Sequence, residues 1–165
     1  SVASFFISRI DSAVDKELRA IGNQDLLGKV AVANAHRAYA LFLDKFNQTS
    51  WKTLEASGAL VQRPLWASTG VKDPAYADTL YVDTLVAPHT VNTMPQSTLD
   101  AFLEHGTVKS DAITAQMESA SKTLGALAAL GISLDSITDA LEADGVKKFE
   151  DAWISLLDDV QKVMS

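Results

Sequence analysis

The sequence contains no cysteine. This absence excludes disulfide bonds, a thiolate nucleophile and any metal site built on thiolates. The chain has three histidines, His36, His89 and His105, and no two of them are spaced as metal ligands. We therefore expect no metal and no other cofactor. A chain without cysteine also suits the reducing cytoplasm, where we expect the protein to be located.

Positive charge and long apolar runs are scarce as well. Lys and Arg number 14 against 21 Asp and Glu, which gives a net charge of −7. Binding to nucleic acid needs a basic face that neutralises phosphates, so we expect no nucleic-acid partner. The longest weakly polar run, residues 124–134, is too short to span a bilayer. No basic segment precedes an apolar one, so no signal peptide is visible, and we expect no membrane partner.

The remaining composition is that of a folded globular chain. Hydrophobic residues make up 47% of the 165 residues and charged residues 21%. This length is sufficient for one domain with a sizeable core. The sequence lacks an initiating Met and enters strand-like sequence within its first few residues. We therefore expect a fragment of a longer protein.

Hydrophobic periodicity predicts three short strands, each followed by helical sequence. Such an order is typical of a parallel α/β sheet. The brief apolar and aromatic run Val2–Ile7 indicates a strand buried on both faces, and Asp11 or Ser12 is expected to cap the helix after it. A turn at Asp144 and Gly145 is expected to separate the last two helices. The predicted strands are residues 2–7, 64–69 and 90–94, and the predicted helices are residues 13–22, 28–46, 50–57, 76–86, 98–105, 112–130, 133–143 and 146–164.

Residues 63–95 organise the chain: RPLWASTGVKDPAYADTLYVDTLVAPHTVNTMP. They predict a strand, a polar loop with Ser68, Thr69 and Lys72, a helix and a second strand. In such βα units the loop at the carboxyl end of the strand carries the chemistry. Its hydroxyls, backbone N–H groups and cation form the set that an anion requires. We expect Tyr76 and Tyr81 on the following helix to be packing residues.

Ser4 and Arg9 form a second candidate anion site. A Ser in a strand and an Arg just beyond it can converge on one anion, because the guanidinium offers a planar bidentate fork and the hydroxyl a further donor. The alternative role for Arg9 is a surface ion pair. The acidic residues cluster on helix faces, especially residues 142–159, where we expect them to be solvated.

Residues 63–95, together with SFFISRID at residues 4–11, resemble the transaldolase family in the form found in actinobacteria, cyanobacteria and transaldolase–isomerase fusions. The resemblance covers nearly the whole chain but only the later half of the family's length. It implies an α/β fold, the C-terminal part of a TIM (β/α)8 barrel comprising strands six to eight with extra C-terminal helices. Residues 1–165 would then form a single partial domain, with barrel units in residues 1–106 and helices packing on the barrel in residues 107–165.

The resemblance also implies roles for site residues. Ser4 and Arg9 match the pair that holds the sugar phosphate, and Ser68 matches the Ser that completes the phosphate pocket. Phe6 matches an aromatic residue near the substrate, although a role in the barrel core is equally compatible. Phe5 stands where the family usually has Pro.

The cation after Ser68 departs from the family pattern. The family commonly has Arg two residues after this Ser, whereas this chain has Lys72 farther along. A Lys lacks the bidentate fork of Arg, so phosphate contact and a loop surface charge both remain open for Lys72. For Asn92, Thr93 and Met94 in the last strand we expect a role in the barrel core.

The reaction that the resemblance implies is transfer of a dihydroxyacetone unit between sugar phosphates, in the pentose phosphate pathway of carbohydrate metabolism. A Lys amine forms a Schiff base with the ketose carbonyl, and a carboxylate and a water or second acid manage the protons. In the family this Lys lies on strand four and the acids on strands one and three. We therefore expect no catalytic residue in this chain, no activity of the chain alone, and two partners, the sugar phosphates and the N-terminal half of the barrel.

Two alternatives remain open at this point. The helical sequence after Ser110 carries no recognisable chemistry and would suit a non-catalytic interaction module. A related Schiff-base aldolase would keep the barrel and change the substrate.

Overall fold

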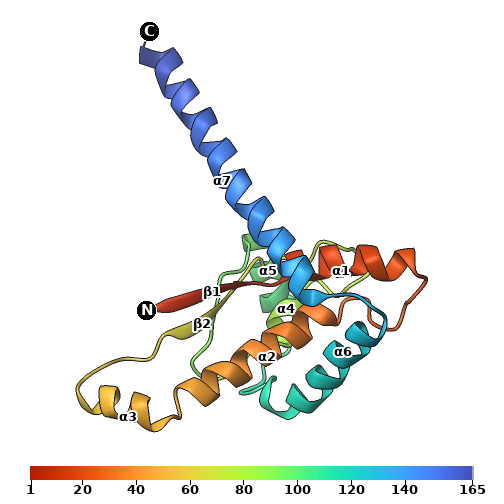
Figure 1. Cartoon of the computed structure of the whole chain (residues 1–165), viewed down its shortest axis with the longest axis vertical. Coiled ribbons are helices and arrows are strands. Elements are labelled where there is room, and N and C mark those ends of the chain that lie inside the picture. The colour runs from red at the N-terminus through yellow and green to blue at the C-terminus, as the bar shows by residue number, and fades with distance from the viewer. Residues whose placement is uncertain (165) are drawn as a thin grey trace. The chain divides into compact units, whose positions relative to one another are not determined.

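The computed structural model describes residues 1–164 and contains a three-stranded parallel sheet with the order β1-β2-β3. The strands are β1 (Val2–Phe6), β2 (Arg63–Ala67) and β3 (Val91–Asn92). Ser4 lies opposite Leu65, and Trp66 lies opposite Asn92. The prediction of an α/β fold with a parallel sheet is confirmed, and because the pairing is parallel all three strands end at the same side of the sheet. Figure 1 shows β1 and β2 side by side.

The helices follow the strands as a parallel sheet requires, because each crossover must return the chain to the end of the sheet where the strands begin.

The chain divides into two compact units, one of residues 1–132 and one that begins at Ser133. The helices are α1 (Ser8–Ala20), α2 (Val30–Lys45), α3 (Thr49–Ala56), α4 (Leu80–Asp83), α5 (Gln96–His105), the 3-10 helix η1 (Thr114–Gln116), α6 (Met117–Ala129) and α7 (Leu134–Met164).

The expectation that the first strand is buried on both faces is wrong for this chain. Val2, Ala3, Ser4 and Phe6 are exposed. Within residues 1–164, β1 pairs with β2 alone and lies at the side of the sheet, where fewer neighbouring side chains cover its two faces. Its apolar sequence is typical of a central strand. In this structure, however, four of its five side chains are exposed to solvent.

The core of the first unit is built around Trp66 in the central strand. Its side chain is 1% exposed, and its indole Nε1–H donates to the Leu85 carbonyl at 2.9 Å. The Phe5 ring meets the Trp66 ring edge-on, with centroids 5.9 Å apart. Edge-to-face packing of this kind adds to the hydrophobic burial. The indole therefore fixes the segment after α4 against the sheet.

Helix α2 carries many small residues, which allow a close approach of α6. Ala31, Ala33 and Ala35 of α2 are buried. On α6 the buried side chains include Ala120 and Leu127, and the two helices lie side by side in Figure 1. The packing stabilises the unit because both apolar stripes leave water together.

Three local expectations are wrong. Only Leu80–Asp83 of the predicted helix 76–86 is helical. Helix α1 begins at Ser8, directly after Ile7, so neither Asp11 nor Ser12 caps it. The expected turn at Asp144 and Gly145 does not form, because α7 continues through it and Asp144 pairs with Lys148 one turn later.

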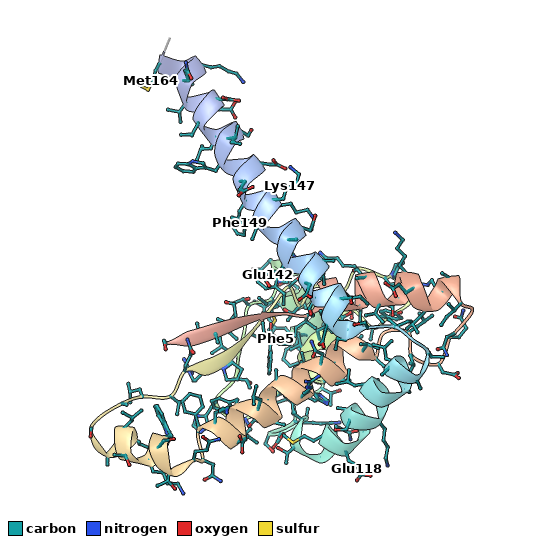
Figure 2. The ribbon with its side chains drawn as sticks, viewed as in Figure 1. Phe5, Glu118, Glu142, Lys147, Phe149 and Met164 are labelled. Atoms are coloured by element: carbon teal, nitrogen blue, oxygen red, sulfur yellow. The ribbon has the colours of Figure 1, made fainter. Side chains whose placement is uncertain are left out.

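Helix α7 is amphipathic along its second half, as the periodicity indicates. Figure 2 shows its side chains, Phe149 and Met164 among them, projecting from the ribbon. The exposed apolar residues are Val146, Phe149, Trp153, Ile154, Leu156, Leu157, Val160, Val163 and Met164. Within residues 1–164, no single helix is both long and apolar enough to cross a membrane; residues 114–129 and α7 meet that length and composition only when counted together.

Gly28 occupies a position that tolerates no side chain, and this generates a prediction for stability. Its φ is +67°, and a Cβ there would lie 2.9 Å from the Tyr76 ring. Gly22 has a similar φ of +74° with nothing within 4 Å. We expect Gly28→Ala to lower the free energy of unfolding by about 1–3 kcal/mol more than Gly22→Ala, because only Gly28 adds overpacking to the left-handed backbone. Urea unfolding followed by tryptophan fluorescence measures both, and equal losses would contradict the contact with Tyr76.

Candidate functional site at the carboxyl edge of the sheet

Two serines join the carboxyl ends of β1 and β2. Ser8 follows β1 after one residue, and Ser68 follows β2 directly. Their hydroxyl oxygens lie 2.8 Å apart, and the Ser8 N–H donates to the Ser68 carbonyl at 3.0 Å. Ser8 is 1% exposed, whereas Ser68 is half-buried. Ser68 is among the residues that the sequence indicates, whereas Ser8 is not, although it belongs to the segment of residues 4–11 that carries Ser4 and Arg9.

The backbone at Ser68 is strained. Its φ is +56°, a left-handed conformation that a residue with a Cβ adopts at a cost of about 1–2 kcal/mol. Strain of this kind is held by surrounding contacts and is common at functional sites. Here it directs the chain from β2 into the polar loop and brings the Ser68 hydroxyl to Ser8.

Thr69 connects the second strand with the third. It is fully buried, and its hydroxyl donates to the Asn92 side-chain oxygen at 2.7 Å. The Asn92 amide in turn donates to the Tyr81 carbonyl at 3.3 Å. Asn92 is therefore a hydrogen-bonded connector between the loop and the segment containing α4.

Arg9 and Phe6 lie together beside the serines. The guanidinium carbon of Arg9 is 4.9 Å from the centre of the Phe6 ring, which is a cation–π contact. Within residues 1–164 Arg9 forms no ion pair with a carboxylate, and Phe6 is 48% exposed. The side chain of Ser4 is exposed and makes no hydrogen bond with any described residue. Ser4 lies within β1 opposite Leu65, two residues before Phe6, so the structure shows contact between Arg9 and Phe6 and leaves Ser4 exposed on the same strand.

Lys72 lies apart from these residues, in a hollow of 350 Å³ that neither Arg9 nor Ser68 lines. It is exposed and forms no hydrogen bond or ion pair with any described residue. The other residues that line the hollow are Asp11, Ser12, Asp15, Arg19, Asp73, Pro74, Tyr76 and Tyr81.

Two carboxylates of α1 are buried at this hollow, which the expectation of solvated acidic side chains missed. Asp11 is 2% exposed; its Oδ1 accepts from the Ala31 N–H at 2.8 Å and its Oδ2 from the Tyr81 hydroxyl at 2.7 Å. Asp15 is 3% exposed and accepts from the Gly28 N–H at 3.2 Å and the Tyr76 hydroxyl at 2.6 Å. The two tyrosines are thus hydrogen-bond donors as well as packing residues.

A signal for these carboxylates exists in the sequence. Asp11 and Asp15 are four residues apart, and they alternate with the buried Ile10, Val14 and Leu18 on one face of α1. Acidic residues on the apolar face of a helix require partners when they are buried.

Burial raises the pKa of Asp11 to about 6, even though the Ala31 N–H and the Tyr81 hydroxyl stabilise its charged form. The nearby Asp15 adds to the increase. Burial also raises the pKa of both Tyr76 and Tyr81, and their aspartate partners raise it further. Asp11 is therefore an acid whose ionisation is disfavoured by the fold.

Two of the three histidines, His36 and His105, have local hydrogen-bond partners. His36 is buried in α2 with Nε2 at 3.1 Å from the Thr84 carbonyl, and burial lowers its pKa. His105 pairs with Asp78 at 2.9 Å, which raises the pKa of this exposed histidine. Among residues 1–164 no three His, Asp or Glu side chains are grouped so that they could hold a metal ion.

Comparison with known proteins identifies the family. The model of the transaldolase/fructose-6-phosphate aldolase family matches residues 1–160. The chain belongs to this family. It is 51% identical to the transaldolase of Arthrobacter sp. (strain FB24) over all of this chain and 45% of that protein. It is 54% identical to the transaldolase of Acidothermus cellulolyticus over 94% of this chain and 51% identical to that of Mycolicibacterium smegmatis over 98%.

These matches confirm the resemblance to transaldolase that the sequence indicates. The chain spans about 45% of the length of the transaldolases that it matches.

The raised pKa of Asp11 makes stability depend on pH in a defined direction. A carboxyl group whose pKa is higher in the folded chain binds its proton more tightly there, so its contribution favours folding at low pH. With pKa values of 3.8 unfolded and about 6 folded, this contribution falls by about 3 kcal/mol as the pH rises through that interval. We expect the stability of the wild type relative to Asp11→Asn to decline accordingly, measured by urea unfolding from pH 4 to 8.

Asp111→Asn provides a control with the opposite sign. Hydrogen bonds from the Thr114 hydroxyl and N–H hold the pKa of Asp111 below its usual value. The stability of the wild type relative to Asp111→Asn should therefore rise as the pH increases. A stability difference between the wild type and Asp11→Asn that does not change with pH would contradict the raised pKa of Asp11.

Proposed function

We propose that this chain is the C-terminal part of a transaldolase and supplies the phosphate-binding side of its active site. The observation that carries the proposal is the family match over residues 1–160, together with relatives named transaldolase at about half identity across the chain. In this proposal β1, β2 and β3 are strands six, seven and eight of a (β/α)8 barrel. Residues 1–106 are barrel units, and residues 107–165 are C-terminal helices that pack on the barrel.

The phosphate site is built at the carboxyl edge of the sheet. Arg9 offers a guanidinium that no carboxylate of residues 1–164 neutralises, and Phe6 supports it from one side. Ser4 and Ser68 add hydroxyls, and the N–H groups at the start of α1 lie at the same end of β1. In this proposal Phe6 lies near the substrate, as the matching aromatic residue of the family does. This set binds and orients a phosphate; it does not break a carbon–carbon bond.

The nucleophile of the proposed reaction comes from the rest of the longer protein. Every lysine of this chain is exposed, and none lies on β1, β2 or β3. A Schiff-base lysine reacts as the neutral amine, which a buried position favours by desolvation. In the complete enzyme, that lysine takes up the ketose carbonyl, while Arg9 and the serines fix the phosphate end so that the substrate is held in a reactive orientation. Sugar phosphates and the N-terminal half of the barrel are the proposed partners, and the cytoplasm is the proposed location.

A chimera tests this function directly. The part of the Arthrobacter transaldolase that this chain does not cover is placed ahead of Ser1. We expect the chimera to transfer a dihydroxyacetone unit from fructose 6-phosphate to erythrose 4-phosphate, and borohydride to trap a covalent adduct on it. This chain alone should show neither, because it lacks the lysine. Turnover without an acceptor aldose would instead favour the related aldolase, and an inactive, correctly folded chimera would contradict the proposal.

Arg9→Lys in the chimera tests the phosphate site. Lysine keeps the charge but loses the bidentate fork, so we expect KM for fructose 6-phosphate to rise about tenfold with a small change in kcat. Arg37→Lys on the exposed side of α2 is the matched control and should leave KM unchanged. Lys72→Gln separates the two roles left open for Lys72, because only a phosphate contact raises KM. An unchanged KM in Arg9→Lys would remove Arg9 from the site.

A further inference from the structure

The pairing of β1 with β2 continues past the ends of both strands and finishes at Ser8. The Ile7 N–H donates to the Ala67 carbonyl at 2.9 Å, and the Ser8 N–H donates to the Ser68 carbonyl at 3.0 Å. The hydroxyl oxygens of Ser8 and Ser68 lie 2.8 Å apart. Ser8 therefore contacts Ser68 twice, through its backbone and through its side chain, at the residue whose φ is +56°. One residue thus restrains both the strained backbone and the hydroxyl of Ser68.

The two serines differ in burial, and this difference determines the direction of the bond between their hydroxyls. Ser8 is 1% exposed, and among residues 1–164 its hydroxyl has no hydrogen-bond partner other than Ser68. A hydroxyl carries one proton, and a buried donor that lacks an acceptor is costly. Ser68 is half-buried, so its own proton can reach water or a ligand. The Ser8 hydroxyl is therefore the donor, and the Ser68 oxygen is the acceptor.

This direction matters for a phosphate ligand, because a phosphate group at neutral pH offers acceptor oxygens. The Ser68 hydroxyl can bind such a group only as a donor. If Ser68 donated to Ser8, its single proton would be used within the protein. With Ser8 as the donor, the Ser68 proton stays available. The bond from Ser8 also polarises the Ser68 hydroxyl, which makes it a stronger donor in turn.

We propose that Ser8 is a positioning residue of the phosphate site. Its buried hydroxyl donates to the Ser68 oxygen, holds that side chain at the ends of β1 and β2, and leaves the Ser68 proton for a phosphate oxygen of the substrate. The inference rests on the proposed function, in which Ser68 contacts the sugar phosphate. Ser8 does not touch the ligand. Because it directly precedes Arg9, its bonds to Ser68 also hold the guanidinium side of the site next to the hydroxyl side.

Ser8→Ala in the chimera tests this role. Alanine keeps the backbone contact with Ser68 but removes the donor, so we expect KM for fructose 6-phosphate to rise about fivefold with a small change in kcat. Ser12→Ala is the matched control. The Ser12 hydroxyl lies one turn farther along α1 and donates to the Ser8 carbonyl at 3.0 Å, without a hydrogen bond to Ser68. Its loss should leave KM unchanged.

A double-mutant cycle with Ser68→Ala separates positioning from a general structural effect. If Ser8 acts through the Ser68 hydroxyl, Ser8→Ala has no further effect once that hydroxyl is absent. The KM of the double variant should then equal that of Ser68→Ala alone. An increase of the same size in both backgrounds would overturn the positioning role, as would an unchanged KM in Ser8→Ala.

Direct phosphate binding keeps this test separate from the proposed reaction. Titration of inorganic phosphate against the chimera, followed by phosphorus NMR, gives a Kd without turnover. Weaker phosphate binding in Ser8→Ala but not in Ser12→Ala would support the role of Ser8 even if the chimera is inactive and the proposed reaction fails. An active chimera whose Kd for phosphate is the same in the wild type and in Ser8→Ala would overturn the role of Ser8 alone.

Discussion

The structure depends on two buried carboxylates of α1. Asp11 joins α1 to the start of α2 and to Tyr81, and Asp15 joins it to Gly28 and Tyr76. Each carboxylate therefore ties together three segments that are distant in sequence. Helix starts and turns leave backbone N–H groups without partners, and burying them is costly. At Gly28 and Ala31 side chains of another helix satisfy these groups.

This arrangement holds together the two sides of the proposed phosphate site. Arg9 precedes Asp11 on α1, and Ser68 precedes the segment that carries both tyrosines, so the hydrogen bonds of Asp11 and Asp15 hold the two sides of the site together. The 2.8 Å contact between Ser8 and Ser68 lies at the junction. The raised pKa of Asp11 indicates that its charge lowers stability at neutral pH. Buried charges of this kind specify one arrangement of segments at the expense of stability.

Local patterns in the sequence predict the strands and the longer helices but not these connections. The periodicity of residues 28–46 and the Gly after residue 57 predict α2 and α3 within a few residues of their observed ends. Residues 76–86 also have helical spacing, yet the Tyr76 and Tyr81 side chains turn toward α1 and only one turn of helix forms. Asp144 and Gly145 read as a turn, whereas helical hydrogen bonding and the Lys148 pair override a propensity cost of about 1 kcal/mol. The site residues followed from the family motif, because composition alone does not distinguish Arg9 from a surface arginine.

The carboxyl ends and the amino ends of the strands differ in how the rest of the chain covers them. The carboxyl edge is held by side chains of this chain, through Ser8 with Ser68 and Thr69 with Asn92. The amino edge and β1 leave apolar surface in contact with water, with Leu60, Val2 and Phe6 exposed. Apolar area exposed in this way is the driving force for association, at about 25 cal/mol per Å² removed from water. One end of the sheet is thus closed by hydrogen bonds of the chain itself, whereas the other end and β1 keep apolar side chains in water.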